Sequence, residues 1–214
     1  IQLIADLVEG KKVLDTGMTQ EIDRCRAALE EAAAGENVVV ISSGDAGING
    51  MAGLVLELLM KRDEEQRPEF GGVIPGVSAM SAAAGLLGAP IMHDFAVISL
   101  SDLLTPWELI QERAELAAKG DFVTVLYNPR SHKRVGQIQA VQEIFLRERA
   151  SETPVGIVTS ASREGENVVI STLGAFTKED INMFSIVIIG NSKTKQNGQW
   201  MITPRGYQKR EPGL

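Results

Sequence analysis

The chain of 214 residues has 44% apolar and 23% charged content, enough apolar material for one large core or two modest ones. A formal net charge of −7 argues against broad nucleic-acid binding, and one cysteine with two histidines excludes an internal disulfide and cysteine-rich metal sites. The absence of a membrane-spanning apolar run or a signal-peptide pattern predicts a cytoplasmic protein with no metal, nucleic-acid or membrane partner.

The first part of the chain is predicted to alternate helices with short strands. Apolar residues at helical spacing predict helices over residues 1–8, 19–29, 51–60 and 77–87. Short strands are predicted over residues 12–15, 37–42 and 72–75. The run VVVI at residues 38–41 is uninterrupted by polar residues, which is typical of a strand buried on both faces of a parallel sheet.

Beyond residue 91 the pattern changes from strand–helix alternation towards successive strands. Strands are predicted over residues 94–100, 122–127, 155–160, 168–173 and 185–189. Helices are predicted after Pro106 and over residues 135–149, and the loop REGE at residues 163–166 suits a hairpin. We therefore predict an α/β fold of two lobes, residues 1–91 with a parallel sheet and residues 92–214 with a mixed sheet.

Glycine-rich loops follow two of the predicted strands. The stretch VISSGDAGING ends at Gly50, at the carboxyl end of a strand, where ligands of open α/β sheets bind. Its spacing matches neither GxGxxG nor the P-loop pattern, and a tight turn capped by Asp45 fits it equally well. Residues 74–79 (IPGVSA) form a second such loop, in which Ser78 can cap the next helix.

Basic side chains gather after the strand predicted at residues 122–127, in the stretch LYNPRSHKR. Arg130, Lys133 and Arg134 stand out, with His132, in an acidic chain. Positive charge is unfavourable at a helix N-terminus, so this cluster favours contact with a carboxylate or phosphate over a merely solvent-exposed first turn.

Polar side chains also flank the strand predicted at residues 94–100. His93 beside Asp94 indicates a hydrogen bond at the lobe junction more than a metal site. Ser101 and Asp102 follow the same strand, where they either cap the coming helix or face a ligand. A Ser–His–Asp relay is a poor fit because no GxSxG motif occurs.

Five motifs together resemble the tetrapyrrole methylases. They are residues 42–48 (SSGDAGI), 74–79 (IPGVSA), 92–107 (MHDFAVISLSDLLTPW), 126–131 (LYNPRS) and 188–191 (IIGN). The similarity spans nearly the whole chain, and the block around Pro106 is its most specific part. Members of that family open with a first strand and a GxGPG-like loop, and this sequence starts after it, so we expect an incomplete methyl-donor site.

The resemblance implies two α/β domains that bind S-adenosylmethionine in the cleft between them and act on a tetrapyrrole, usually as a homodimer. It implies methylation of carbon 17 of a precorrin-3B-type tetrapyrrole with ring contraction, in cobalamin biosynthesis. The donor contacts carried over are Ser43, Gly44, Asp45, Ile48, Ser78, Ala79, Asn128 and Ala161. The expected substrate contacts are Ser101, Arg130, Lys133 and Arg134. The expected groups for proton handling are Asp102, His93 and Tyr127.

Three other functions stay open from the sequence. The chain could be another family member with a different acceptor, a nucleotide-dependent oxidoreductase, or a module that binds a tetrapyrrole without turnover. The block around Pro106 counts against a different acceptor, and the missing GxGxxG motif weakens the oxidoreductase.

Overall fold

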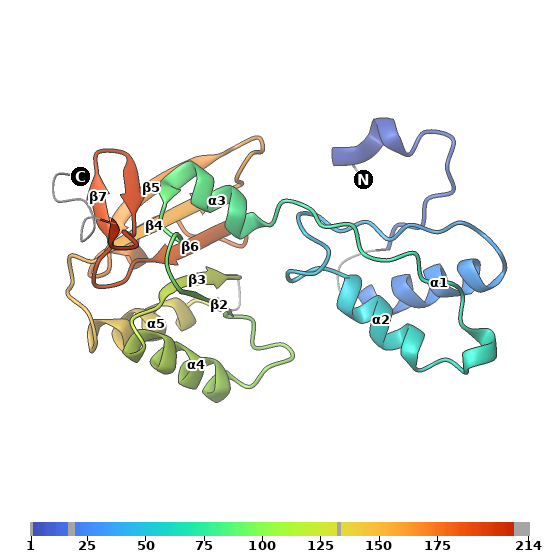
Figure 1. Ribbon diagram of the computed structural model, residues 1–214, viewed down its shortest axis with the longest axis horizontal. Helices are drawn as coiled ribbons and strands as arrows, with labels where there is room; N and C mark the ends of the chain where they lie inside the picture. Colours follow the sequence, from blue (N-terminus) through green and yellow to red (C-terminus); the bar gives the residue numbers. More distant parts are fainter. Residues whose placement is uncertain (1, 17–19, 132–133, 208–214) are drawn as a thin grey trace. The chain divides into compact units, whose positions relative to one another are not determined.

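The computed structural model describes residues 2–16, 20–131 and 134–207 (Figure 1). The chain divides into two units, Ile1–Ser78 and Ala79–Leu214, and each is described separately below. Within the described ranges, every helix is too short or too polar to cross a membrane.

The first unit is built on two helices that pack against each other. Its helical elements are the 3-10 helices η1 (Gln2–Leu7) and η2 (Glu64–Gln66) and the α-helices α1 (Glu21–Ala33) and α2 (Ala52–Met60). Cys25 and Leu29 of α1 meet Val55 and Leu59 of α2 in a small apolar core. Burial raises the pKa of the Cys25 thiol, so the thiol stays protonated and this lone cysteine packs as an apolar residue.

The strands predicted in the first unit are not found in the structure. Residues 12–15, 37–42 and 72–75 belong to no sheet, and Val39 and Ile74 are exposed. Their β-branched composition indicates an extended backbone, but a strand also needs a neighbouring strand to take up its ladder hydrogen bonds. Among the described residues, the α/β class is therefore confirmed in the second unit, and the parallel sheet expected in the first lobe is missing.

The second unit contains a mixed five-stranded sheet with the order β2-β3-β6-β4-β5. Its strands are β2 (Phe95–Ser99), β3 (Val123–Tyr127), β4 (Pro154–Thr159), β5 (Asn167–Thr172) and β6 (Ser185–Ile189). A smaller sheet has β1 (Gly88–Ala89), β8 (Trp200–Ile202) and β7 (Lys195–Asn197), in that order. The predicted strands, the mixed sheet and the hairpin between β4 and β5 are confirmed.

Strand direction brings three strand ends to one edge of the larger sheet. β2 and β3 are parallel, while β6 is antiparallel to both β3 and β4, so β2, β3 and β4 run the same way. They end at Ser99, Tyr127 and Thr159, and we call this edge the carboxyl edge. Loops at such an edge are where open α/β sheets bind ligands.

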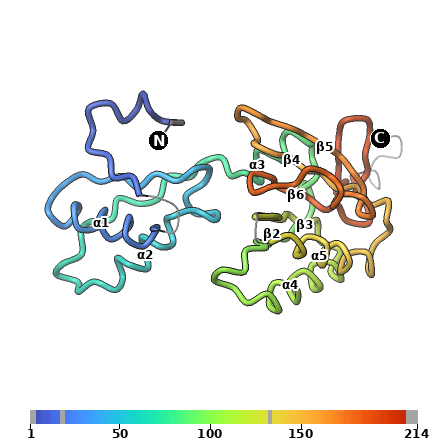
Figure 2. The backbone as a smooth tube through the Cα atoms, turned by 180° about the vertical axis from the view of Figure 1, so that it is seen from behind, coloured from blue at the N-terminus to red at the C-terminus, as the bar shows by residue number. Residues whose placement is uncertain are grey.

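Helices cover both faces of this sheet (Figure 2). The helices are α3 (Ala79–Leu87), α4 (Trp107–Lys119), α5 (Gln137–Leu146) and the 3-10 helix η3 (Phe176–Lys178). α4 and α5 pack on one face around Phe145, and α3 packs on the other around Leu87. A Cβ on Gly156 of β4 would lie 2.4 Å from Leu87, so the glycine lets α3 approach the sheet closely.

The packing of α3 also decides to which unit it belongs. α3 contacts β4, β5 and β6, so it lies in the second unit together with β1. The lobes predicted from the sequence, residues 1–91 and 92–214, differ from this division in the placement of α3 and β1.

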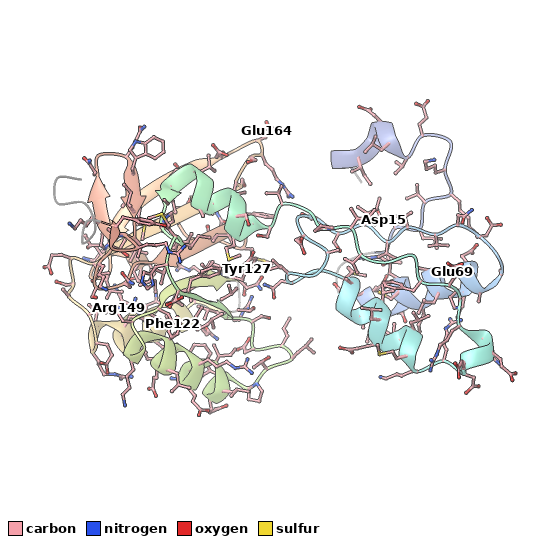
Figure 3. The ribbon with its side chains drawn as sticks, viewed as in Figure 1. Asp15, Glu69, Phe122, Tyr127, Arg149 and Glu164 are labelled. Atoms are coloured by element: carbon pink, nitrogen blue, oxygen red, sulfur yellow. The ribbon has the colours of Figure 1, made fainter. Side chains whose placement is uncertain are left out.

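A buried arginine binds backbone carbonyl groups at the edge of the sheet opposite the carboxyl edge. The guanidinium of Arg149 donates hydrogen bonds to the carbonyl oxygens of Gly190, Phe122 (2.8 Å) and Ala117 (3.3 Å). It also lies 4.7 Å from the centre of the Phe145 ring. Figure 3 shows Arg149 and Phe122 at one end of β3 and Tyr127 at the other.

Candidate functional site

Two glycine loops of the first unit are joined by the carboxylate of Asp45. Its Oδ1 accepts hydrogen bonds from the N–H groups of Gly47 (2.8 Å) and Ile48 (3.1 Å), and its Oδ2 accepts one from Gly76 N–H (2.9 Å). These backbone donors hold the pKa of Asp45 below its usual range. Asp45 therefore stays ionised and holds together the two loops that the sequence singled out.

The same loops touch backbone to backbone. A Cβ on Gly76 would lie 2.2 Å from the carbonyl oxygen of Gly44, so no other residue fits there without moving a loop. Ser42 Oγ accepts a hydrogen bond from Met51 N–H (3.0 Å) and fixes the far end of the first loop. Ser43, Gly44 and Ile48 remain exposed, so this fixed loop presents them to solvent.

The last two residues of the second loop fall into different units. Ser78, which is buried, ends the first unit, and Ala79 begins α3 in the second. Within the second unit, the hydroxyl of Tyr127 accepts a hydrogen bond from Met80 N–H (3.0 Å). Tyr127 therefore satisfies one of the free donors in the first turn of α3, a role that sequence reasoning did not anticipate.

The carboxyl edge of the second unit brings together Asn128 and Ser99. Asn128 has φ 51°, in the left-handed region that asparagine tolerates, and its Nδ2 donates to Ser99 Oγ (3.0 Å). Ala161 follows β4 at the same edge and packs in the apolar cluster that contains Tyr127. The sequence analysis did not identify Ser99 as a site residue. The available signal was its position at the end of a predicted strand, as Asn128 follows the end of another.

Asp102 and Arg134 form a network at the same edge. Arg134 Nε lies 3.9 Å from Asp102 Oδ1, and Arg134 Nη1 donates to the carbonyl of Leu100 (3.1 Å). Gln137 Nε2 donates to Asp102 Oδ2 (3.2 Å). The Arg134 side chain is mostly buried, and the network ties the loop after β2 to the loop after β3. Sequence reasoning missed Gln137, although it lies only three residues beyond Arg134, at the start of α5.

Arg130 differs from Arg134 in having no partner among the residues that the structure describes. It is half-buried after β3, and within the described ranges no acceptor is paired with it. An unpaired guanidinium at a strand end is suited to a carboxylate or phosphate of a ligand. Ser101 follows β2 at the same edge, and its N–H donates to Ser99 Oγ (3.3 Å).

Two predicted residues do not join this group. Lys133 lies outside the residues that the structure describes. His93 precedes β2 and so lies at the opposite end of that strand from Asp102, where its Nδ1 accepts a hydrogen bond from Asp94 N–H (2.8 Å).

Comparisons with known proteins agree on one family. The family model described as Tetrapyrrole (Corrin/Porphyrin) Methylases matches residues 4–177. The chain is 49% identical over 212 residues to a cobalt-factor III methyltransferase of Priestia megaterium, of which it spans only 39%. It is 51% identical over 207 residues, 96% of its own length, to a probable cobalt-factor III C(17)-methyltransferase of Salmonella typhimurium, of which it covers 84%.

More distant relatives extend the same pattern. A precorrin-3B C(17)-methyltransferase of a Sinorhizobium species is 39% identical over 193 residues, 88% of this chain and 76% of the relative. The crystal structure of the methyltransferase CobJ superposes with a TM-score of 0.86 at 38% identity, covering 92% of this chain and 82% of that one.

Proposed function

Because the chain belongs to the tetrapyrrole (corrin/porphyrin) methylases, we propose that it methylates carbon 17 of cobalt-factor III with S-adenosylmethionine, contracting the macrocycle in cobalamin biosynthesis. The observation that carries this proposal is the identity of about one half to cobalt-factor III methyltransferases across nearly the whole chain. The lower identity to the precorrin-3B relative favours the cobalt-containing acceptor over the metal-free one.

The methyl donor fits the exposed glycine loop of the first unit. S-adenosylmethionine supplies a methyl group on a sulfonium, which leaves readily without covalent help from the protein. The task of the protein is to align the donor with the acceptor carbon and to exclude water. We assign Ser43, Gly44 and Ile48 to the donor and give Asp45 the role of holding the loop that presents them. Ser78, Ala79, Asn128 and Ala161 complete the proposed donor set.

The tetrapyrrole substrate fits the carboxyl edge of the second unit. Its acetate and propionate groups require cations, and Arg130 is the described arginine of this edge without an internal partner. Arg134, in contrast, is occupied by Asp102 and Leu100, so we propose that it orders the binding loops instead of contacting the substrate. Ser101 and Lys133 are the remaining proposed substrate contacts.

Proton transfer during ring contraction is assigned to Asp102. Its carboxylate is one-third exposed at the carboxyl edge, where it pairs with Arg134. Tyr127 is a weaker candidate because its buried hydroxyl is engaged by Met80, and His93 lies at the opposite end of β2. The Asp102→Asn variant should retain binding of S-adenosylhomocysteine and lose ring contraction.

A single incubation tests the proposed reaction. The full chain is mixed with cobalt-factor III and S-adenosylmethionine that carries a carbon-13 methyl group. A product heavier by one labelled methyl, with its carbon-13 resonance coupled to the C17 position and an absorption spectrum of a contracted ring, is expected. A labelled methyl at another carbon would replace the proposal with a different acceptor position, and binding without transfer would make the chain a carrier.

We also propose that the protein works as a homodimer in a reducing cytoplasm. The buried, unpaired Cys25 is in keeping with a reducing compartment. Sedimentation velocity of the full chain tests the dimer, and a single monomeric species at micromolar concentration would exclude it.

A further inference from the structure

The three most exposed large apolar side chains described in the second unit all lie at the carboxyl edge. Leu103 is 81% exposed, Leu104 is 98% exposed and Phe184 is 73% exposed. Leu103 and Leu104 follow β2, and Phe184 immediately precedes β6, which starts at this edge. We call these three residues the apolar rim. Exposed apolar groups gathered at one place on a protein mark a binding surface more often than scattered ones do.

The apolar rim is held in place by the protein and is not a loose loop. Asp102, next to Leu103, forms an ion pair with Arg134 and accepts a hydrogen bond from Gln137. On the other side of Leu103 and Leu104, Pro106 is the N-cap residue of α4, and its carbonyl oxygen accepts a hydrogen bond from Leu109 N–H (3.1 Å). Phe184 is fixed by its carbonyl oxygen, which accepts from Ser160 N–H (3.1 Å). Figures 1 and 2 both show the loop after β2 projecting from the body of its unit.

The rim residues follow or precede the two strands that flank β3, the strand that leads into Arg130. β2 and β6 are the two neighbours of β3 in the sheet, so they lie about 10 Å apart with the Arg130 loop between them. A ligand that suits this arrangement has a broad apolar face and carboxylates at its margin. A tetrapyrrole with acetate and propionate groups has both.

We propose that Leu103, Leu104 and Phe184 bind the apolar face of the tetrapyrrole while Arg130 binds one of its carboxylates; this inference rests on the proposed function. A second copy of the chain is the alternative occupant, and the measurement of mass by sedimentation described below distinguishes it. The rim residues thereby determine the affinity for the macrocycle and leave binding of the methyl donor unchanged.

Glutamine substitutions separate this role from a structural one. Leu103→Gln/Leu104→Gln and Phe184→Gln remove the apolar contact at exposed positions, so the fold should be retained. Leu116→Gln is the matched control, because Leu116 is 63% exposed on α4, away from the carboxyl edge. The full-length variants are compared for the KM of cobalt-factor III, for binding of S-adenosylhomocysteine by calorimetry, and for mass by sedimentation.

The double leucine variant should raise the KM for cobalt-factor III at least about tenfold, since burial of each leucine is worth roughly a factor of ten or more. Leu104→Met should stay near the wild-type KM, and S-adenosylhomocysteine should bind all variants equally. An unchanged KM in the double variant overturns the inference, and so does a change of oligomeric state without a change of KM. If the wild-type chain itself fails to methylate cobalt-factor III, the proposed function fails first, which is a distinguishable result.

Discussion

Replacing Gly76 by alanine tests whether the two glycine loops of the first unit act as one binding element. The added Cβ would lie 2.2 Å from the carbonyl oxygen of Gly44, whereas ordinary contact begins at 3.4 Å. Both groups belong to the backbone, so the loops must separate by roughly 1 Å to accept the methyl group. That separation breaks the 2.9 Å hydrogen bond between Gly76 N–H and Asp45.

The expected effect of Gly76→Ala is large because we propose that the loop presents the methyl donor. A misplacement of about 1 Å in a positioning group can cost about 100-fold in rate, so kcat/KM for S-adenosylmethionine should fall by about that factor. Calorimetric titration with S-adenosylhomocysteine should show weaker binding. Gly71→Ala is the matched control, since a Cβ there meets nothing within 4 Å and the residue lies in the same segment.

Both alanine variants lose the same backbone freedom in the unfolded chain, so their comparison isolates the contact in the folded state. If Gly76→Ala bound S-adenosylhomocysteine as tightly as Gly71→Ala and turned over as fast, the loops would be shown to tolerate separation. The reasoning from Asp45 and Gly76 would then be refuted.

Three further predictions concern charged side chains. Arg130→Gln should raise the KM for cobalt-factor III about tenfold or more without changing donor binding, whereas Arg113→Gln on the exposed face of α4 should leave both unchanged. Arg149→Met should lower the free energy of unfolding in urea by about 3 kcal/mol, because three carbonyl oxygens lose their charged hydrogen-bond donor. Arg147→Met should lower it by less than about 1 kcal/mol, because Arg147 forms only an exposed ion pair with Glu115. Since the folded pKa of Asp45 lies below its unfolded value, its stabilisation is present at neutral pH and is lost as the pH falls below the ordinary carboxyl range and through the lowered folded pKa. The stability difference between wild type and Asp45→Asn, measured by urea unfolding from neutral to acid pH, should therefore shrink as the pH falls; a constant difference would contradict this.

The sequence predicted the second unit well because its strands carry their own signal. Residues 185–189 and 122–127 are apolar except for Ser185 and Thr124 and occupy the middle of a sheet, and the hairpin loop at 163–166 lies between two patterned strands. The same reasoning failed at residues 38–41, whose pattern is equally strong. An apolar β-branched run reports that a segment is extended, but the neighbour that would pair with it is a non-local fact.

The candidate site shows the same limit at the level of single side chains. The cluster of basic residues after β3 was visible from the sequence, but nothing in it distinguished Arg134, held by Asp102 and Leu100, from Arg130, which has no such partner among the described residues. That distinction depends on a carboxylate thirty-two residues earlier in the chain, brought near by the parallel pairing of β2 and β3. Likewise, Asp45 was recognisable as a cap, but its bond to Gly76 was not.

Arg149 makes the two ends of the larger sheet in the second unit different from each other. Near the amino end of β3, this one internal cation binds the carbonyl oxygens of Ala117, Phe122 and Gly190, so contacts within the protein stabilise this end. The loops at the carboxyl edge, which we propose bind the substrate, can then vary in sequence while the far end keeps the strands in register. A new acceptor preference could therefore evolve through substitutions in the loops after β2 and β3 without loss of stability in the sheet.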